Sequence, residues 1–382
     1  MTQALAEPLT PPPEARPAAR IAARENNFDL VRILAALQVA LLHASAHMKV
    51  PPEGVWAHLA AVLRVFPGVP IFFVVSGFLI SASYERNPDL RSYFRARLLR
   101  IYPALWVCLA ISLAVAGAFG FLPPDVVLSP LFAAWLAGQI TLVQFYNPPF
   151  LRGFGIGVLN GSLWTIPVEL TFYVCVPALY GALVRGRARR TSNALLGLVA
   201  LASFTVGYAM TTGVFGPIQA MQTKVVQVTV APHLYMFLLG VLAQRNWDVV
   251  ERLLRGRFLL WIVPYTALAL ALQQQILGGP LLTALARAML AATVLSGAFS
   301  APWLSARALR HQDISYGFYL YHMVIINVFI ALGLVGRLSH LLAALGLTVL
   351  AALASWRLIE KPALARKGGA LVKRGEHAQA AS

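Results

Sequence analysis

A series of apolar runs, each long enough to cross a lipid bilayer as one helix, dominates this chain of 382 residues. Because a bilayer offers no water to backbone amides, a run of this kind forms a helix. Hydrophobic residues make up 59% of the chain and charged residues only 12%, which predicts an all-α fold, a polytopic helical bundle of an integral membrane protein. The runs lie near 28–47, 67–83, 99–120, 128–146, 163–184, 193–212, 225–243, 258–276, 281–300, 314–335 and 339–359.

The positions of Lys and Arg decide which runs cross, because these residues collect in short cytoplasmic loops. About ten transmembrane helices with both termini in the cytoplasm place most basic clusters on that side. The run 128–146 then has to be a re-entrant or interfacial segment, and it has prolines near both ends and no basic residue. Residues 26–362 are predicted to form the membrane domain, with a disordered cytoplasmic tail at 1–25 and a basic one at 363–382.

Several functional classes are disfavoured. The net charge of +17 is spread in short runs between apolar segments, which is typical of membrane topology and not of a nucleic-acid-binding patch. Cys108 and Cys175 each lie in an apolar run, so neither a disulfide framework nor a thiolate metal site is expected. No internal repeat is evident, which weakens an inverted-repeat transporter interpretation.

The first apolar run contains two ionisable side chains, Arg32 and His43. An Arg near the centre of an inserted helix costs about 2.5–3.5 kcal/mol, so such residues usually mark function. Eleven residues of helix place Arg32 and His43 on one face, about 16 Å apart along the axis. His47, one turn beyond His43, extends this polar stripe.

The second and third runs carry further candidates. Ser76 and Gly77, followed by Phe78, form a small pair within a span, which allows close approach of a ligand or equally of another helix. Arg97 and Arg100 are three residues apart near a predicted helix start, a spacing suited to phosphate oxygens. Positive-inside topology alone also accounts for arginines at this place.

Two later stretches add polar groups inside apolar runs. Glu169, in the stretch SLWTIPVELTFY that also holds Trp164, is the only carboxylate between Asp125 and Asp248. A buried Glu requires an Arg, His or hydroxyl partner, and the predicted topology places Glu169 near the depth of His43. Tyr319 and His322 share a helix face in ISYGFYLYH. For each of them, a structural hydrogen bond between helices is the alternative interpretation.

These stretches together resemble the membrane acyltransferase 3 family. The resemblance rests on the Arg-x10-His pair, FFVVSGFLI, RARLLRIYPAL, SLWTIPVELTFY, ISYGFYLYH and the terminal IEKP, which also reads as a membrane-exit signal, and it covers about residues 26–362. It implies an O-acetyltransferase of the bacterial inner membrane. Such an enzyme moves an acyl group, usually acetyl, from acyl-CoA to a hydroxyl of a cell-surface or exported glycan, often lipid-linked, without a tightly bound cofactor.

The chemistry of these residues, taken with the resemblance, suggests a mechanistic hypothesis. His43 is expected to act as general base or transient acyl carrier, with Glu169 or His322 orienting it. Arg32 would meet the donor, whose diphosphate Arg97 and Arg100 would hold. Ser76, Gly77, Phe78, Trp164, Tyr319 and His322 complete the expected substrate contacts. The expected partners are acyl-CoA, a glycan or lipid-linked sugar and membrane lipid, but no nucleic acid.

Two other functions remain open from the residues alone. A proton-coupled transporter or flippase could use the same Arg, His and Glu as a relay. A metal site built from His43, His47 and His322 is less favoured, because oxygen or sulfur ligands at conventional spacing are missing. No metal is therefore expected.

Overall fold

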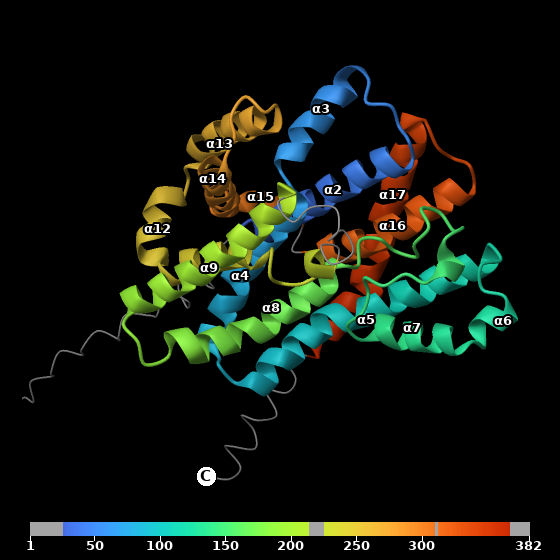
Figure 1. Cartoon of the computed structure of the whole chain (residues 1–382), viewed down its shortest axis with the longest axis horizontal. Coiled ribbons are helices and arrows are strands. Elements are labelled where there is room, and N and C mark those ends of the chain that lie inside the picture. Colours follow the sequence, from blue (N-terminus) through green and yellow to red (C-terminus); the bar gives the residue numbers. More distant parts are fainter. Residues whose placement is uncertain (1–25, 214–224, 310–311, 367–382) are drawn as a thin grey trace, which may run out of the picture.

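The computed structural model describes residues 26–213, 225–309 and 312–366, and these residues form an all-α bundle without strands (Figure 1). The predicted fold class is therefore confirmed. The predicted tail 1–25 lies outside the described residues, and of 363–382 only 363–366 are described, in and just after a short helix. The helices are α2 (Phe28–His47), α3 (Gly54–Val65), α4 (Gly68–Arg86), α5 (Leu90–Ala118), α6 (Pro124–Val127), α7 (Pro130–Ile140), α8 (Thr165–Leu179), α9 (Arg189–Thr211), α11 (Leu234–Arg245), α12 (Trp247–Leu254), α13 (Phe258–Gln273), α14 (Pro280–Ala298), α15 (Trp303–Leu309), α16 (Ser315–Ala331), α17 (Leu338–Ser355) and α18 (Lys361–Ala365).

Among the described residues, seven helical stretches are long and apolar enough to cross a membrane, and the count is eight if α12 and α13, which are bent by 80°, form one broken span. The count of ten therefore stays a prediction. Two runs counted as crossings contain the shorter helices α11, with 12 residues, and α16, with 17 residues. The run 128–146 contains only α7, with 11 residues, so the described helix there is too short to span alone.

One helix was not expected from the sequence. Residues 54–65 form α3, which leads into α4 through Phe66 and Pro67. The side chains of Val55, Leu59 and Val62 on α3 are exposed. The segment is too short to meet the length criterion used for the apolar runs, which explains the omission.

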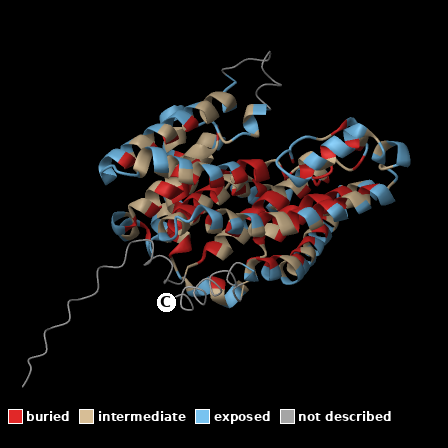
Figure 2. Cartoon of the chain, turned by 90° about the horizontal axis from the view of Figure 1, so that it is seen from below, coloured by how far each residue is buried: buried red, intermediate tan, exposed pale blue. Residues whose placement is uncertain are grey.

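The centre of the bundle is built around α4, which packs against α2, α8, α11 and α14. In Figure 1, α12, α13 and α14 lie at one end of the molecule and α5, α6 and α7 at the other, with α4 and α8 between them. Buried residues are concentrated in the middle of the molecule (Figure 2). The contact between α4 and α11 is a backbone contact, because a Cβ atom on Gly77 would lie 1.9 Å from the Phe237 carbonyl oxygen.

We expect Gly77→Ala to destabilise this contact. The added methyl group meets backbone atoms, which cannot move aside as a flexible side chain would, and overpacking of this kind costs about 1–3 kcal/mol or more. The apparent Tm of the purified protein should fall, with a loss of monodisperse material in size-exclusion chromatography. Gly197→Ala in α9 is the matched control, because nothing lies within 4 Å of the added Cβ atom. A Tm equal to that of wild type for Gly77→Ala would show that the two helices can separate freely.

The loop that leads into α8 is held against α16 by two asparagines. The Asn327 side chain donates to the Val158 carbonyl oxygen at 2.9 Å, and its own oxygen accepts from the Ile156 amide at 3.1 Å. Asn160 donates to the Leu320 carbonyl oxygen at 2.8 Å. These bonds fix the start of α8 relative to α16, and so fix the depth at which α8 presents its carboxylate.

Candidate functional site

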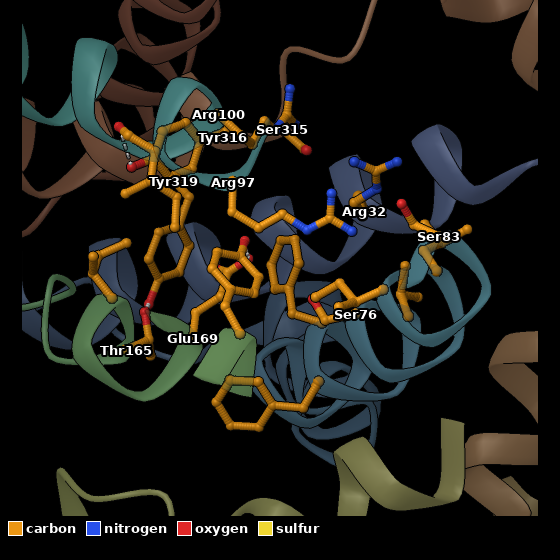
Figure 3. A pocket seen from close by; sticks show the side chains of 18 of the residues that line it. Arg32, Ser76, Ser83, Arg97, Arg100, Thr165, Glu169, Ser315, Tyr316 and Tyr319 are labelled. Carbon is orange, nitrogen blue, oxygen red and sulfur yellow. Dashed lines mark hydrogen bonds between the residues drawn. The ribbon is translucent and has the colours of Figure 1, made fainter. Parts of the chain in front are cut away.

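A cavity of about 370 Å³ lies between α2, α4, α5, α8 and α16, with Leu364 of α18 also in its wall. Six of the predicted site residues line it, namely Arg32, Ser76, Arg97, Arg100, Glu169 and Tyr319. Figure 3 shows Arg97 reaching into the middle of the cavity, with Glu169 from α8 below and Arg32 from α2 beside it. The other polar lining residues are Ser83, Arg86, Thr165, Tyr173, Ser315 and Tyr316.

Two of the cavity arginines share one carboxylate that the sequence analysis did not select. Arg32 Nη1 donates to Asp313 Oδ2 at 2.5 Å, and Arg100 Nη2 donates to the same oxygen. Burial alone would raise the pKa of Asp313, but Arg100 and Arg32 hold that pKa well below its usual range, so the carboxylate stays ionised at neutral pH. A signal was present, because Asp313 is the only carboxylate between Glu251 and Glu360.

The terminal IEKP motif also contributes to this cluster. Glu360 was interpreted as part of a membrane-exit anchor, but its side chain is buried and accepts from the Ser355 hydroxyl at 2.9 Å. Its other carboxylate oxygen lies 3.9 Å from Arg100 Nη1. A π-helical turn at Trp356–Glu360 breaks the regular α-helical register, which sequence periodicity does not reveal.

Arg97 has a different environment from its two neighbours. It makes no ion pair with any carboxylate in the described part of the chain, and its buried Nε atom has no hydrogen-bond partner. Its guanidinium lies over the Tyr93 ring, 4.6 Å from the centroid, and 6.0 Å from that of Tyr173. The α5 helix begins at Leu90, where Asp89 caps it, so Arg97 lies inside the helix and not at the helix start that the sequence predicted. The guanidinium of Arg97 is thus more available to an anion than those of Arg32 and Arg100, which are paired with Asp313.

Glu169 faces the arginine cavity, where it accepts a hydrogen bond from the Tyr173 hydroxyl at 2.6 Å. The hydrogen bond of His43 is instead made to His322, at 3.1 Å between His43 Nδ1 and His322 Nε2. Of the two residues expected to orient His43, the structure therefore brings His322 to it.

Hydrogen bonding defines the tautomers of the two histidines. His322 Nδ1 lies 2.7 Å from the Tyr319 carbonyl oxygen, which can only accept, so Nδ1 carries the proton. His322 Nε2 is then an acceptor, and His43 Nδ1 donates to it. His43 Nε2 consequently bears a lone pair. His322 is fully buried, whereas His43 is only partly buried.

Tyr319 connects the cavity with the histidine pair. Its side chain lines the cavity, and its ring centroid is 5.6 Å from that of His322. Its hydroxyl donates to the Ser162 carbonyl oxygen at 2.9 Å and lies 3.0 Å from Thr165 Oγ1. The arginine cavity and the histidines are therefore neighbouring parts of one polar region inside an apolar bundle.

Four predicted substrate contacts do not line the cavity, namely His322, which pairs with His43, and Gly77, Phe78 and Trp164. Gly77 faces α11, and Phe78 is fully buried in an aromatic cluster with Phe28 and Trp247. Trp164 packs with its ring centroid 5.4 Å from that of His233. Only Ser76 of the Ser-Gly-Phe motif reaches the cavity. Within the described ranges, no group of three or more His, Cys, Asp or Glu side chains could hold a metal ion.

The fold and site define a multi-pass membrane protein with a polar, arginine-lined cavity beside a hydrogen-bonded histidine pair. The chain belongs to the acyltransferase domain family, whose pattern matches residues 25–357, and the resemblance inferred from its motifs is thereby confirmed. It is accordingly a membrane acyltransferase.

Individual relatives support this assignment. Nodulation protein 10 of Rhizobium leguminosarum bv. viciae is 36% identical over 365 residues, which are 91% of this chain and 96% of the relative. The exopolysaccharide production protein ExoZ of Rhizobium meliloti (strain 1021) is 27% identical over 78% of this chain and 89% of its own length. The O-acetyl transferase of Shigella phage Sf6 is 29% identical over 43% of this chain and 49% of its own length. No solved structure is significantly similar to the chain.

Proposed function

We propose that this chain transfers an acyl group, most simply acetyl, from acyl-CoA to a hydroxyl of a cell-surface or exported glycan. The observation that carries the proposal is the placement of an arginine-lined cavity next to His43, with Tyr319 in contact with both regions. The names of the phage relative and of ExoZ, an O-acetyl transferase and an exopolysaccharide protein, agree with this acceptor class.

The spacing within α2 supports a donor with a long arm. Arg32 and His43 are eleven residues apart on one helix, about 16 Å along its axis. A donor held at the arginines must therefore carry its reactive carbonyl at the end of an extended linker. An acyl-CoA has this form, because a pantetheine arm separates its phosphates from its thioester. Acetyl phosphate carries both groups within a few bonds and does not fit this distance.

The proposed reaction uses His43 Nε2 as the general base. This atom removes the proton of the acceptor hydroxyl while the hydroxyl oxygen attacks the thioester carbonyl. The carbon–sulfur bond breaks, and the imidazolium returns the proton to the departing thiolate, which yields CoA and an O-acyl glycan. His322 holds the His43 ring by accepting from Nδ1, and it stabilises the imidazolium while the proton resides there.

We infer that the arginine end faces the cytoplasm of a bacterial cell and that the domain lies in its inner membrane. Arg91 and Arg95 near the start of α5 lie at this end, and Arg95 Nη2 donates to the Arg366 carbonyl oxygen at 3.4 Å. Basic residues favour the cytoplasmic side, where acyl-CoA is made. Both termini would then be cytoplasmic, as the sequence predicts.

The geometry disfavours a proton-coupled transporter. A relay through the histidine pair would have to continue beyond His322 Nδ1, whose partner is the Tyr319 backbone carbonyl. A backbone carbonyl accepts a hydrogen bond but does not take up and release a proton at neutral pH. The pair thus ends in a fixed acceptor, which suits the orientation of one base.

Donor specificity tests the proposal. Purified protein in lipid nanodiscs is incubated with a panel of oligosaccharide acceptors and either acetyl-CoA or acetyl phosphate. Consumption of the unmodified oligosaccharide is measured together with the release of free thiol from acetyl-CoA or of phosphate from acetyl phosphate. We expect turnover with acetyl-CoA but not with acetyl phosphate, and only when an acceptor is present. Equal turnover with acetyl phosphate would contradict the distance argument, and binding of no acyl-CoA would contradict the proposed donor.

A further inference from the structure

Asp313 lies between two guanidinium groups at the place where an anionic ligand would bind them. A single oxygen, Oδ2, accepts from Arg32 on α2 and from Arg100 on α5. Bridging of this kind is how an oxygen of a phosphate group engages a pair of arginines. The Asp313 carboxylate oxygen therefore occupies the position that a phosphate oxygen would take between the two guanidinium groups.

The carboxylate is also fixed from behind. Its other oxygen, Oδ1, accepts from the Ser315 hydroxyl at 2.5 Å and from the Ser315 amide at 3.3 Å. The Asp313 side chain is only 9% exposed, whereas the side chains of Arg32 and Arg100 are 22% and 21% exposed. The two guanidiniums thus keep an accessible side toward the cavity, and the carboxylate that neutralises them is held in place.

Arg97 provides an internal comparison. It lines the same cavity but has no ion pair with any carboxylate that the structure describes. Arg97 thus offers a guanidinium without a described ion pair, whereas Arg32 and Arg100 are already bound to a resident anion. An entering phosphate group meets full attraction from Arg97 but has to compete with Asp313 for Arg32 and Arg100.

We propose that Asp313 is an internal competitor for the phosphates of the donor. It lowers the affinity of the cavity for anions to a level that lets the CoA product leave after transfer, while it keeps the two arginines in position. The donor here is the acyl-CoA of the proposed function, on which this role rests. Asp313 acts through Arg32 and Arg100 and is a positioning residue, not one that touches the reacting atoms.

The test is anion affinity in Asp313→Asn. Equilibrium binding of CoA and, separately, of inorganic pyrophosphate is measured in nanodiscs at low and high salt. Because each freed guanidinium can make a charge-assisted hydrogen bond, we expect CoA to bind Asp313→Asn about tenfold more tightly than wild type. The gain should shrink at high salt, and kcat should fall as CoA release slows. A residue with only a structural role would not increase affinity when it is replaced.

Asp248→Asn is the matched control, since Asp248 pairs with Arg189 in an exposed ion pair outside the cavity, and its CoA affinity should equal that of wild type. If Asp313→Asn does not fold, Arg100→Gln is compared with Arg100→Gln/Asp313→Asn, in which Arg32 alone is released. The double variant should again bind the anion more tightly. Equal or weaker binding after removal of Asp313, in folded protein, overturns the proposal.

The two probes separate this inference from the proposed function. Wild-type protein that binds pyrophosphate but not CoA would contradict the acyl-CoA donor, while the pyrophosphate affinities would still report on Asp313. Wild-type protein that binds CoA, with no gain in Asp313→Asn, would leave the donor in place and contradict the competitor.

Discussion

Replacing His43 with alanine is expected to lower kcat for acyl transfer by about 10²–10⁴-fold, the usual contribution of a positioned general base. His43 Nδ1 donates to His322, and His322 Nδ1 donates to the Tyr319 carbonyl oxygen. These two hydrogen bonds leave the lone pair on His43 Nε2 free to accept a proton. No other described imidazole is held in this way beside the cavity. Initial rates of CoA release by purified protein give the measurement.

His47→Ala is the control for this prediction. His47 lies one turn from His43 on the same face, with ring centroids 5.7 Å apart, but it takes no part in the hydrogen bond to His322. Its replacement should change kcat by no more than a few-fold. The affinity for CoA should survive in both variants, because the arginines are on the other side of Tyr319. Rapid turnover by His43→Ala would mean that another group removes the acceptor proton.

Arg97→Ala is expected to raise KM for acyl-CoA by about 10–100-fold with a smaller effect on kcat. Arg97 makes no ion pair with a described carboxylate, so its removal deletes a charge-assisted hydrogen bond to the donor, worth about 1.5–3 kcal/mol. Because such a phosphate contact lies far from the reacting carbonyl, it stabilises substrate and transition state alike and affects KM more than kcat.

The control for Arg97→Ala lies on the same helix. Arg95 is exposed and points away from the cavity toward the Arg366 carbonyl oxygen, so Arg95→Ala removes the same charge without changing the lining. Its KM should stay within about two-fold of wild type at physiological salt, because exposed charges are screened. An equal rise of KM in both variants would indicate general electrostatic attraction instead of a specific phosphate contact.

Much of the site was accessible to sequence reasoning because polar groups in apolar runs are costly. This cost singles out Arg32 and Glu169, the three-residue spacing of Arg97 and Arg100 indicates a phosphate contact, and all four side chains line one cavity. The pairing of His43 with His322 was foreseen as one of two possibilities, because depth in the membrane can be estimated along each helix. Which partner is chosen depends on helix rotation, and α8 turns Glu169 toward the arginines.

The omissions also have physical causes. Asp313 lies in a connection between helices, where an acidic residue is ordinary, and its importance arises only because α2 and α5 meet there. Glu360 is brought inward by a π-helical turn. The Ser-Gly-Phe motif was divided among three environments, since Gly77 serves the contact with α11 and Phe78 the core. The number of crossings could not be fixed by hydropathy, because α11 and α16 are shorter than the runs that contain them.

The central claim, that His43 carries out acyl transfer from acyl-CoA to a glycan hydroxyl, is tested most directly by following a labelled acetyl group. Wild type and His43→Ala in nanodiscs receive radiolabelled acetyl-CoA and a glycan acceptor, and label is counted in the glycan and in the protein. Base-labile label on the glycan with wild type, and almost none with His43→Ala, is the predicted result. Label held on wild-type protein before it reaches the glycan, and absent from His43→Ala, would indicate that His43 is an acyl carrier. Equal labelling of the glycan by both proteins, or none by either, would contradict the account.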